Sequence, residues 1–263
     1  MTQTAEKQLN SRVEGNGEHL VFIHGWGLNS AIFSPMVDMF KQQFTVTCID
    51  LPGFGDNVDS HLKDYSLGNL ATAVADVIDQ PSIVVGWSLG GLVASELALH
   101  HSDKVKAVVT ITSSPYFVDD EHWPGIKPEL LRGFHQQLAV SADKTISNFL
   151  RIQAMGAAHV RADIKEIKAL IDSRPHASKE TLDASLSLLE TVDLRAKIQN
   201  IDIPFLRLYG RLDSLVPKAV IEQMDKLVPQ SDSYTFYGAS HAPFISHKDE
   251  FKQVLCDWIS GIK

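Results

Sequence analysis

The chain has 263 residues, of which 44% are hydrophobic, and a formal net charge of −8. This length and composition fit one globular domain with an ample core and room for an inserted subdomain. The acidic balance argues against nucleic-acid binding, and the lack of an 18-residue apolar run argues against insertion in a membrane.

Apolar runs alternate with helical patterns in the early and late parts of the chain. The strand-like runs are His19–Ile23, Phe44–Ile49, Ser82–Val85, Val105–Thr112, Phe205–Tyr209 and Ser233–Tyr237. Helical patterns lie between them, at about 30–41, 67–79, 89–101, 218–228 and 248–259. Short buried strands that alternate with helices are typical of an α/β protein with a mostly parallel sheet flanked by helices.

The middle of the chain differs, because no convincing strand occurs from about Tyr116 to Glu190. Phe149–Met155 and Ile164–Ile171 have helical spacing instead. Since the strand pattern resumes afterwards, we expect one sheet domain, residues 1–115 and 191–263, interrupted by a helical cap at residues 116–190.

The N-terminal stretch carries no apolar core of a signal peptide. The two cysteines, Cys48 and Cys256, are too few for a disulfide framework or a metal set, so we expect buried free thiols. A cytoplasmic protein without metal or cofactor follows, and we expect it to be a monomer.

The strongest single motif is Gly86-Trp87-Ser88-Leu89-Gly90, between a β-branched run and a helical pattern. Strand, Gly-x-Ser-x-Gly and helix together predict a nucleophile elbow, which presents the Ser88 hydroxyl at a helix N-terminus. An ordinary serine in a glycine-rich turn is the alternative. The elbow points to acyl transfer through a serine ester.

A nucleophilic serine needs a base and a group that orients the base. In the elbow fold these follow in the order Ser, Asp or Glu, then His. Asp213 follows one predicted strand and His241 the next, so both would lie at the carboxyl edge of the sheet. We therefore predict Ser88, Asp213 and His241 as the catalytic residues.

The turn after the first strand reads His24-Gly25-Trp26-Gly27. A loop in this position supplies one backbone N–H of an oxyanion hole, and the residue after the nucleophile supplies the other. We assign these donors to Trp26 and Leu89. The Trp26 side chain would form an apolar wall of the cleft, or alternatively only part of the core.

A dinucleotide-binding fingerprint competes at the same turn, since Gly25-x-Gly27-x-x-Ser30 is followed by Asp50 about 20 residues on. The third glycine is replaced by Ser30, and Trp26 would crowd a pyrophosphate. This interpretation also leaves Ser88, Asp213 and His241 unexplained, so we set it aside.

With these features the chain resembles an α/β-hydrolase with a helical cap over nearly its whole length. It resembles one family, the pimeloyl-acyl-carrier-protein methyl ester esterases of biotin synthesis, more closely at five stretches: His24–Asn29, Asp50–Gly55, Gly86–Ser95, Trp123–Pro128 and His241–His247. The resemblance implies a serine carboxylesterase that removes the methyl ester from a pimeloyl chain on acyl-carrier protein. It implies substrate contacts at Trp26, Ser88, Leu89, Phe149, Leu150, Arg151, Ile152, Gln153 and His241.

The resemblance also implies that the acidic carrier docks on basic residues of the cap: Lys144, Arg151, Arg161, Lys165 and Lys168. Lys144 and Lys165 stand where the family has arginine, and Asn148 replaces another; lysine keeps the charge but loses bidentate geometry. From Trp123 to Ile171, seven Lys or Arg face four Asp or Glu, a net of +3. A merely solvated cap face would show the same charges.

Three functions therefore remain open. The first is the carrier-dependent carboxylesterase, and the second is a general short-chain carboxylesterase, thioesterase or C–C bond hydrolase acting on small esters or related substrates with the same triad. The third is a non-catalytic binding protein that keeps the hydrolase pocket for a small ligand.

Overall fold

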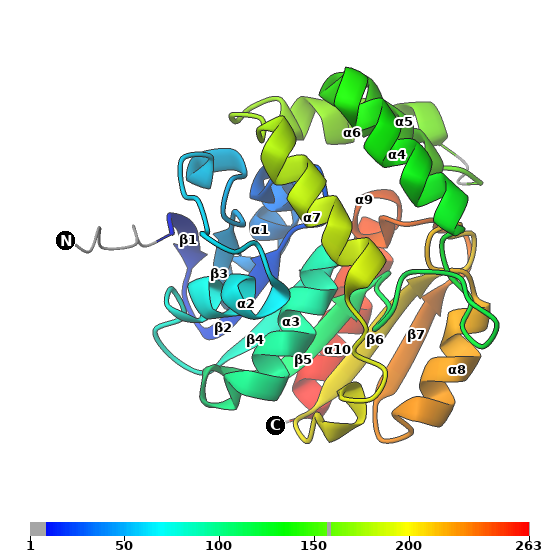
Figure 1. The fold of residues 1–263 in the computed structure, drawn as a ribbon. Helices are drawn as coiled ribbons and strands as arrows, with labels where there is room; N and C mark the ends of the chain where they lie inside the picture. The colour runs from blue at the N-terminus through cyan, green and yellow to red at the C-terminus, as the bar shows by residue number, and fades with distance from the viewer. Residues whose placement is uncertain (1–8, 157–158, 263) are drawn as a thin grey trace.

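A seven-stranded sheet runs through the computed structural model, which describes residues 9–156 and 159–262 (Figure 1). The strand order is β1-β3-β2-β4-β5-β6-β7, with β2 to β7 parallel and β1 antiparallel to β3. The strands are β1 (Ser11–Gly15), β2 (Glu18–Ile23), β3 (Phe44–Ile49), β4 (Ser82–Trp87), β5 (Val105–Ile111), β6 (Phe205–Gly210) and β7 (Asp232–Phe236).

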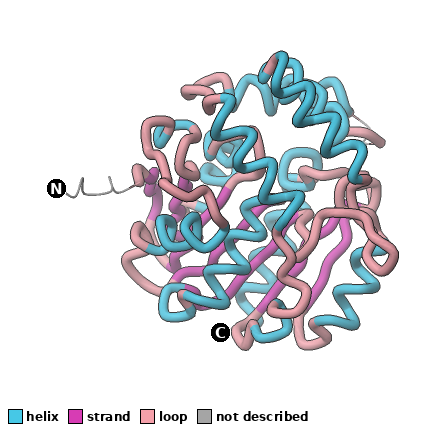
Figure 2. Tube along the Cα trace, viewed as in Figure 1, coloured by secondary structure: helices cyan, strands magenta, loops and turns pink. Residues whose placement is uncertain are grey.

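Helices cover both faces of this sheet. They are α1 (Ser34–Phe40), α2 (Leu67–Ala75), α3 (Leu89–His100), α8 (Ala219–Leu227), α9 (Pro243–Ser246) and α10 (Lys248–Gly261). The pair α2 and α3 packs together on one face, and α1 packs with α10 on the other (Figures 1 and 2). Every residue of β3, β4 and β6 is buried as a result, which explains why these strands are mostly apolar. The charged exception, Arg207 in β6, pairs with Asp225.

Four helices between β5 and β6 lie over one end of the sheet (Figure 1). They are α4 (Pro128–Val140), α5 (Ala142–Gln153), α6 (Val160–Ile171) and α7 (Lys179–Thr191). The described residues of the segment 116–190 form no strand, only isolated bridges at Tyr116 and between Val118 and Ile126. The predicted domain limits at residues 1 and 263 lie outside the described residues. The same holds for residues 157–158 of the predicted cap.

Two local predictions are corrected. Strand β1 was not expected, because all five of its residues are exposed at the sheet edge and its pattern has no buried apolar face. The helix expected at 30–41 is a 3₁₀ turn at Ser30–Phe33 followed by α1. Pro35 lies in the first turn of α1, where its missing N–H is tolerated, so the helix begins there.

The two cysteines are free, but only Cys48 is buried, since Cys256 is half-buried on α10. Burial raises the pKa of the Cys48 thiol to about 12, so it stays protonated and inert. In the part of the chain that the structure describes, none of the helices is both long and apolar enough to cross a membrane.

Candidate active site

Ser88 sits in a strained turn between β4 and α3. Its φ of 55° and ψ of −117° are rare for a residue with a side chain, and the N-terminus of α3 starts directly after it. A Cβ at Gly86 would overlap the Gly90 carbonyl, and one at Gly90 would overlap the Ile23 carbonyl. The two flanking glycines are therefore required by the close approach of backbone.

The end of β5 and the segment that follows it hold this turn in place. The Ser88 N–H donates to the Ile111 carbonyl at 2.9 Å, and the Ser113 hydroxyl donates to the Ser88 carbonyl at 2.8 Å. Only one other described non-glycine residue, Thr112, has a positive φ. The surrounding hydrogen bonds offset the cost of the strained conformation.

Asp213 and His241 form a buried pair at the same edge of the sheet. His241 Nδ1 lies 2.7 Å from Asp213 Oδ2, and both side chains are almost fully buried. The other carboxylate oxygen, Oδ1, accepts the N–H groups of Leu215 and Val216 at 2.8 and 3.1 Å. Because an ionised carboxylate only accepts, His241 Nδ1 carries the proton and Nε2 presents its lone pair.

The backbone of His241 is fixed against the elbow. Its carbonyl accepts the indole N–H of Trp87 at 2.8 Å and the hydroxyl of Thr112 at 2.7 Å. Trp87 is the residue before Ser88, so the histidine loop is anchored directly beside the serine. His241 Nε2 is buried and has no hydrogen-bond partner among the described residues. This leaves Nε2 available to take a proton.

The loop after β2 passes against the elbow. A Cβ on Gly25 would lie 3.2 Å from the Ser88 Cβ, so the backbone of this loop is close to the serine. Neither the Trp26 N–H nor the Leu89 N–H donates a hydrogen bond to another described residue. An oxyanion hole needs two such free donors, and here one directly follows Ser88 while the other belongs to the loop that lies against it; their assignment remains a prediction.

The Trp26 side chain is fully buried under the cap. Its indole N–H donates to the Leu182 carbonyl on α7 at 2.9 Å, and its ring meets Phe149 edge-on at 4.8 Å. Trp26 therefore joins the loop to the cap, and its ring adjoins the stretch that the resemblance assigns to the substrate.

His24 and Asp50 form hydrogen bonds that hold the two ends of this loop. Leu51 N–H donates to His24 Nε2 at 3.0 Å, and Asp50 Oδ1 accepts the Ser30 N–H at 2.5 Å. Asp50 also pairs with Arg174 of the cap. Ser30 and Asp50 of the rejected dinucleotide fingerprint are thus engaged in structural hydrogen bonds, and the Asp50 carboxylate is not free to bind a ribose.

The stretch 149–153 forms the last part of α5, with its residues in different environments. Phe149, Leu150 and Gln153 are buried, Ile152 is half-buried and Arg151 is exposed. Both polar side-chain atoms of Gln153 are buried without a hydrogen-bond partner among the described residues. Such an amide is suited to a polar ligand group, whereas Arg151 lies with the exposed cations.

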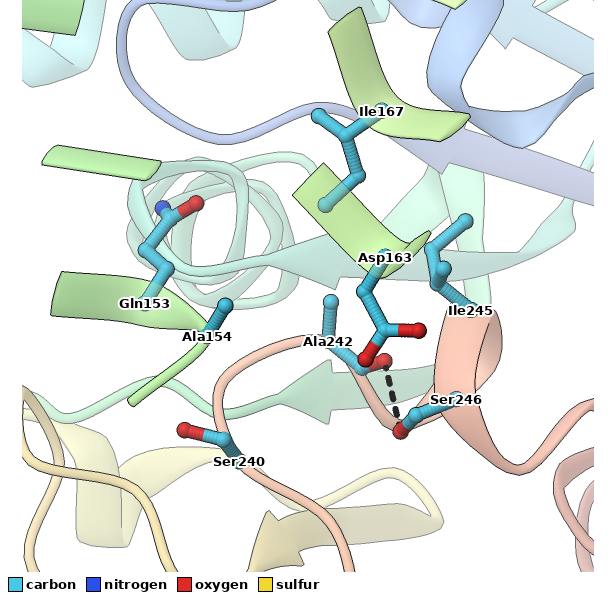
Figure 3. Close-up of a pocket in the computed structure, with 8 residues that line it drawn as sticks. All are labelled: Gln153, Ala154, Asp163, Ile167, Ser240, Ala242, Ile245 and Ser246. Atoms are coloured by element: carbon cyan, nitrogen blue, oxygen red, sulfur yellow. Dashed lines mark hydrogen bonds between the residues drawn. The ribbon is translucent and has the colours of Figure 1, made fainter. Parts of the chain in front are cut away.

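A small cavity is bordered by Ser240 and Ala242, the residues before and after His241 in the chain (Figure 3). Its volume is about 10 Å³, enough for one water molecule. It is lined by Gln153, Ala154, Asp163, Ile167, Ser240, Ala242, Ile245 and Ser246. Burial raises the pKa of Asp163. Of these residues only Gln153 was expected in the site; Ser240 and Ala242 flank His241, which is the signal that could have identified them.

The five predicted docking residues lie on α5 and α6. Arg161, Lys165 and Lys168 follow one another along α6, and Lys168 Nζ reaches the Ser147 hydroxyl of α5 at 3.3 Å. None of the five forms an ion pair with a described carboxylate, whereas the cap residues Lys127 and Arg132 are paired with Asp119 and Glu129. A groove of about 350 Å³ runs beside Lys168 between the two helices.

Taken together, the geometry supplies a serine in a strained turn, a buried His–Asp pair, and two backbone N–H groups without a partner among the described residues. Among the described residues, no group of three or more His, Cys, Asp or Glu side chains is placed to hold a metal ion. The arrangement supports acyl transfer through a covalent serine ester.

Comparisons with known proteins agree on the fold. Residues 18–248 match the family model for the α/β hydrolase fold. The chain is 45% identical, over 92% of its length and 95% of the relative's, to a pimeloyl-[acyl-carrier protein] methyl ester esterase from Aeromonas hydrophila subsp. hydrophila.

Solved structures extend this likeness at lower identity. An esterase from Exiguobacterium antarcticum superposes with a TM-score of 0.86 at 20% identity, covering 96% of this chain and 95% of that one. An enol-lactonase from Burkholderia xenovorans LB400 gives 0.82 at 19%, covering 96% of both chains. At such identities the likeness concerns the fold alone.

Proposed function

The chain belongs to the pimeloyl-[acyl-carrier protein] methyl ester esterases of the α/β-hydrolase fold, and from this membership we propose that it hydrolyses the methyl ester of a pimeloyl chain carried on acyl-carrier protein. The observation that carries the chemistry is the buried Asp213–His241 pair. The Nε2 atom of His241 has no partner among the described residues, and the His241 backbone is bound to Trp87, the residue before Ser88.

In the first half of the reaction, Ser88 Oγ attacks the carbonyl carbon of the methyl ester. His241 Nε2 takes the hydroxyl proton, and the Asp213 carboxylate stabilises the imidazolium that forms. The carbonyl oxygen of the ester becomes an oxyanion, which the N–H groups of Trp26 and Leu89 bind. Each such donor is worth roughly 3 kcal/mol of transition-state stabilisation.

The tetrahedral intermediate then collapses. The C–O bond to the methyl group's oxygen breaks, His241 returns the proton, and methanol leaves. Ser88 now carries the acyl group as an ester. Water activated by His241 attacks this ester, and the free carboxylate of the pimeloyl chain is released.

The acidic carrier would bind on the cap over α5 and α6. Lys144, Arg151, Arg161, Lys165 and Lys168 supply positive charge that no described carboxylate neutralises. Phe149 and Leu150, on the buried face of α5, supply apolar surface for the acyl chain. The enzyme would act in the cytoplasm as a monomer.

The experiment that tests this function compares carrier-bound and free substrates. Purified protein should convert pimeloyl-acyl-carrier-protein methyl ester to the free acid, as read from the mass of the carrier, and the Ser88→Ala variant should not. The chain should also restore growth without biotin to a strain that lacks this esterase. If only free short-chain esters are hydrolysed, the protein is a general esterase; if no ester is hydrolysed, it is a binding protein.

A further inference from the structure

The C-terminal end of α5 is held by the two loops that carry Asp213 and His241. The last carbonyls of a helix have no partner within the helix. Here three carbonyls at the end of α5 and just beyond it accept hydrogen bonds from those loops. The pairs are Ser214 Oγ to Ile152 O at 3.3 Å, His241 N–H to Gln153 O at 3.1 Å, and Ser240 Oγ to Met155 O at 3.0 Å.

Ser240 occupies the junction of three segments. Its side chain is buried, and its hydroxyl lies 3.0 Å from the Met155 carbonyl of the cap and 3.4 Å from the Leu212 carbonyl of the Asp213 loop. Figure 3 shows it on the loop that borders the cavity, across from the end of α5 at Gln153 and Ala154. With a single proton to donate, the hydroxyl bonds mainly to Met155, the shorter contact.

The backbone of His241 is therefore restrained from two sides. The core holds its carbonyl through Trp87 and Thr112, and the cap holds its N–H through the Gln153 carbonyl. Releasing the cap side would leave the Asp213 contact in place but would let the loop shift. A displacement of about 1 Å in catalytic geometry can cost about 10²-fold in rate.

We propose that Ser240 is a positioning residue. By binding the turn after α5 to the loops of Asp213 and His241, it keeps the imidazole of His241 correctly placed relative to Ser88. The inference rests on the proposed role of His241 as the base. Through these contacts the His241 loop is bound directly to α5. The same helix bears Lys144 and the apolar residues of the proposed acyl site.

The test is Ser240→Ala, with Ser82→Ala as the matched control. Ser82 is equally buried, and its hydroxyl donates to the Gln80 carbonyl at 2.8 Å, at the opposite end of the sheet from the site. Turnover of nitrophenyl acetate and the rate at which a fluorophosphonate labels Ser88 report the chemistry without the carrier. We expect Ser240→Ala to lower kcat and the labelling rate about 5- to 20-fold with little change in KM.

The control Ser82→Ala should lower the melting temperature by about as much as Ser240→Ala does, and it should leave kcat unchanged. Ser240→Thr, which keeps the hydroxyl, should recover most of the rate. If Ser240→Ala lowers only the melting temperature, or lowers kcat no more than Ser82→Ala does, the proposal is overturned. Should the alanine variant fail to fold, Ser240→Cys retains the volume with only a weak donor, and a wild-type kcat in that variant overturns the proposal equally.

The outcomes separate this inference from the proposed substrate. A wild-type enzyme that cleaves nitrophenyl acetate but not the carrier-bound ester refutes the substrate and leaves the Ser240 result standing. A wild-type protein that neither cleaves the small ester nor reacts with the fluorophosphonate refutes the triad, and the role of Ser240 with it.

Discussion

The guanidinium of Arg174, in the cap, lies 2.6 Å from the carboxylate of Asp50 at the end of β3, and both side chains are buried. The same Arg174 nitrogen donates to the Ser30 hydroxyl at 2.7 Å, while the Ser30 N–H donates to Asp50. Ser30 follows the loop that contains Trp26. This ion pair therefore connects the cap to the segment that carries the predicted oxyanion hole.

Removal of Arg174 should destabilise the protein strongly, because Asp50 would remain buried without its partner. For a buried pair broken on one side, the cost is about 3–5 kcal/mol. Arg174→Met should therefore reduce the free energy of unfolding in urea by an amount in this range. The control is Arg132→Met, which removes an exposed cap arginine paired with Glu129 and should cost less than about 1 kcal/mol. Equal losses would show that the Asp50 pair contributes no more than a surface contact.

The free energy of unfolding should depend on pH through the protonation of His24. Burial lowers the pKa of His24, and the nearby Asp50 carboxylate only partly opposes this shift. Its ring donates to the Gly25 carbonyl and accepts the Leu51 N–H, as a neutral imidazole does. The unfolded chain therefore binds a proton on acidification before the folded protein does.

The sign follows from linkage: stability falls as the pH drops below the unfolded value of about 6.5, by up to about 1.4 kcal/mol per pH unit, until the folded His24 also titrates. His24→Gln cannot bind this proton. The stability advantage of the wild type over the variant should thus be largest at pH 8 and shrink at pH 5.5, measured by urea unfolding. An advantage that grows on acidification would contradict the neutral, buried assignment.

Ser88 and His241 should behave as one catalytic unit. Ser88→Ala and His241→Ala should each reduce nitrophenyl acetate turnover by several orders of magnitude, and the double variant should lose little more, since each residue works only through the other. Far-ultraviolet circular dichroism should remain that of the wild type. Multiplicative losses in the double variant would mean that the two residues act independently.

The basic cap face should matter for the carrier-bound ester alone. Arg161→Gln with Lys165→Gln removes two exposed cations that form no ion pair with a described carboxylate, and should raise KM for that substrate about tenfold at low salt. The loss should shrink as added salt screens the attraction, whose range is about 8 Å at physiological ionic strength. Turnover of nitrophenyl acetate should be unchanged.

The matched control for the cap is Lys127→Gln with Arg132→Gln. This pair changes the net charge by the same amount, but the two cations are already neutralised by Asp119 and Glu129. The control should leave KM near the wild-type value. If both double variants act alike, the carrier responds to overall charge and not to the α5–α6 face.

Much of the architecture follows from local sequence patterns. Strands buried on both faces are mostly apolar, so β3, β4 and β6 are visible as runs in the sequence, although β6 also contains the ion-paired Arg207. The elbow is also a local feature, because backbone overlap at Gly86 and Gly90 permits only glycine around Ser88. Strand β1 escapes such analysis, since an exposed edge strand needs no apolar pattern.

The sequence by itself determined the alternation of strands and helices, the elbow at Ser88 and the placement of Asp213 and His241 just after strands, because each is set by residues close together in the chain. Only the tertiary structure decided how the cap meets the site. Trp26 bonds to Leu182, Asp50 pairs with Arg174, and the carbonyl of Gln153 receives the N–H of His241. The partners in these contacts lie far apart in the chain, and two of the three contacts use a backbone carbonyl, which every residue has. No local pattern can identify such a partner, because it is chosen by the packing of the helices that bring it there.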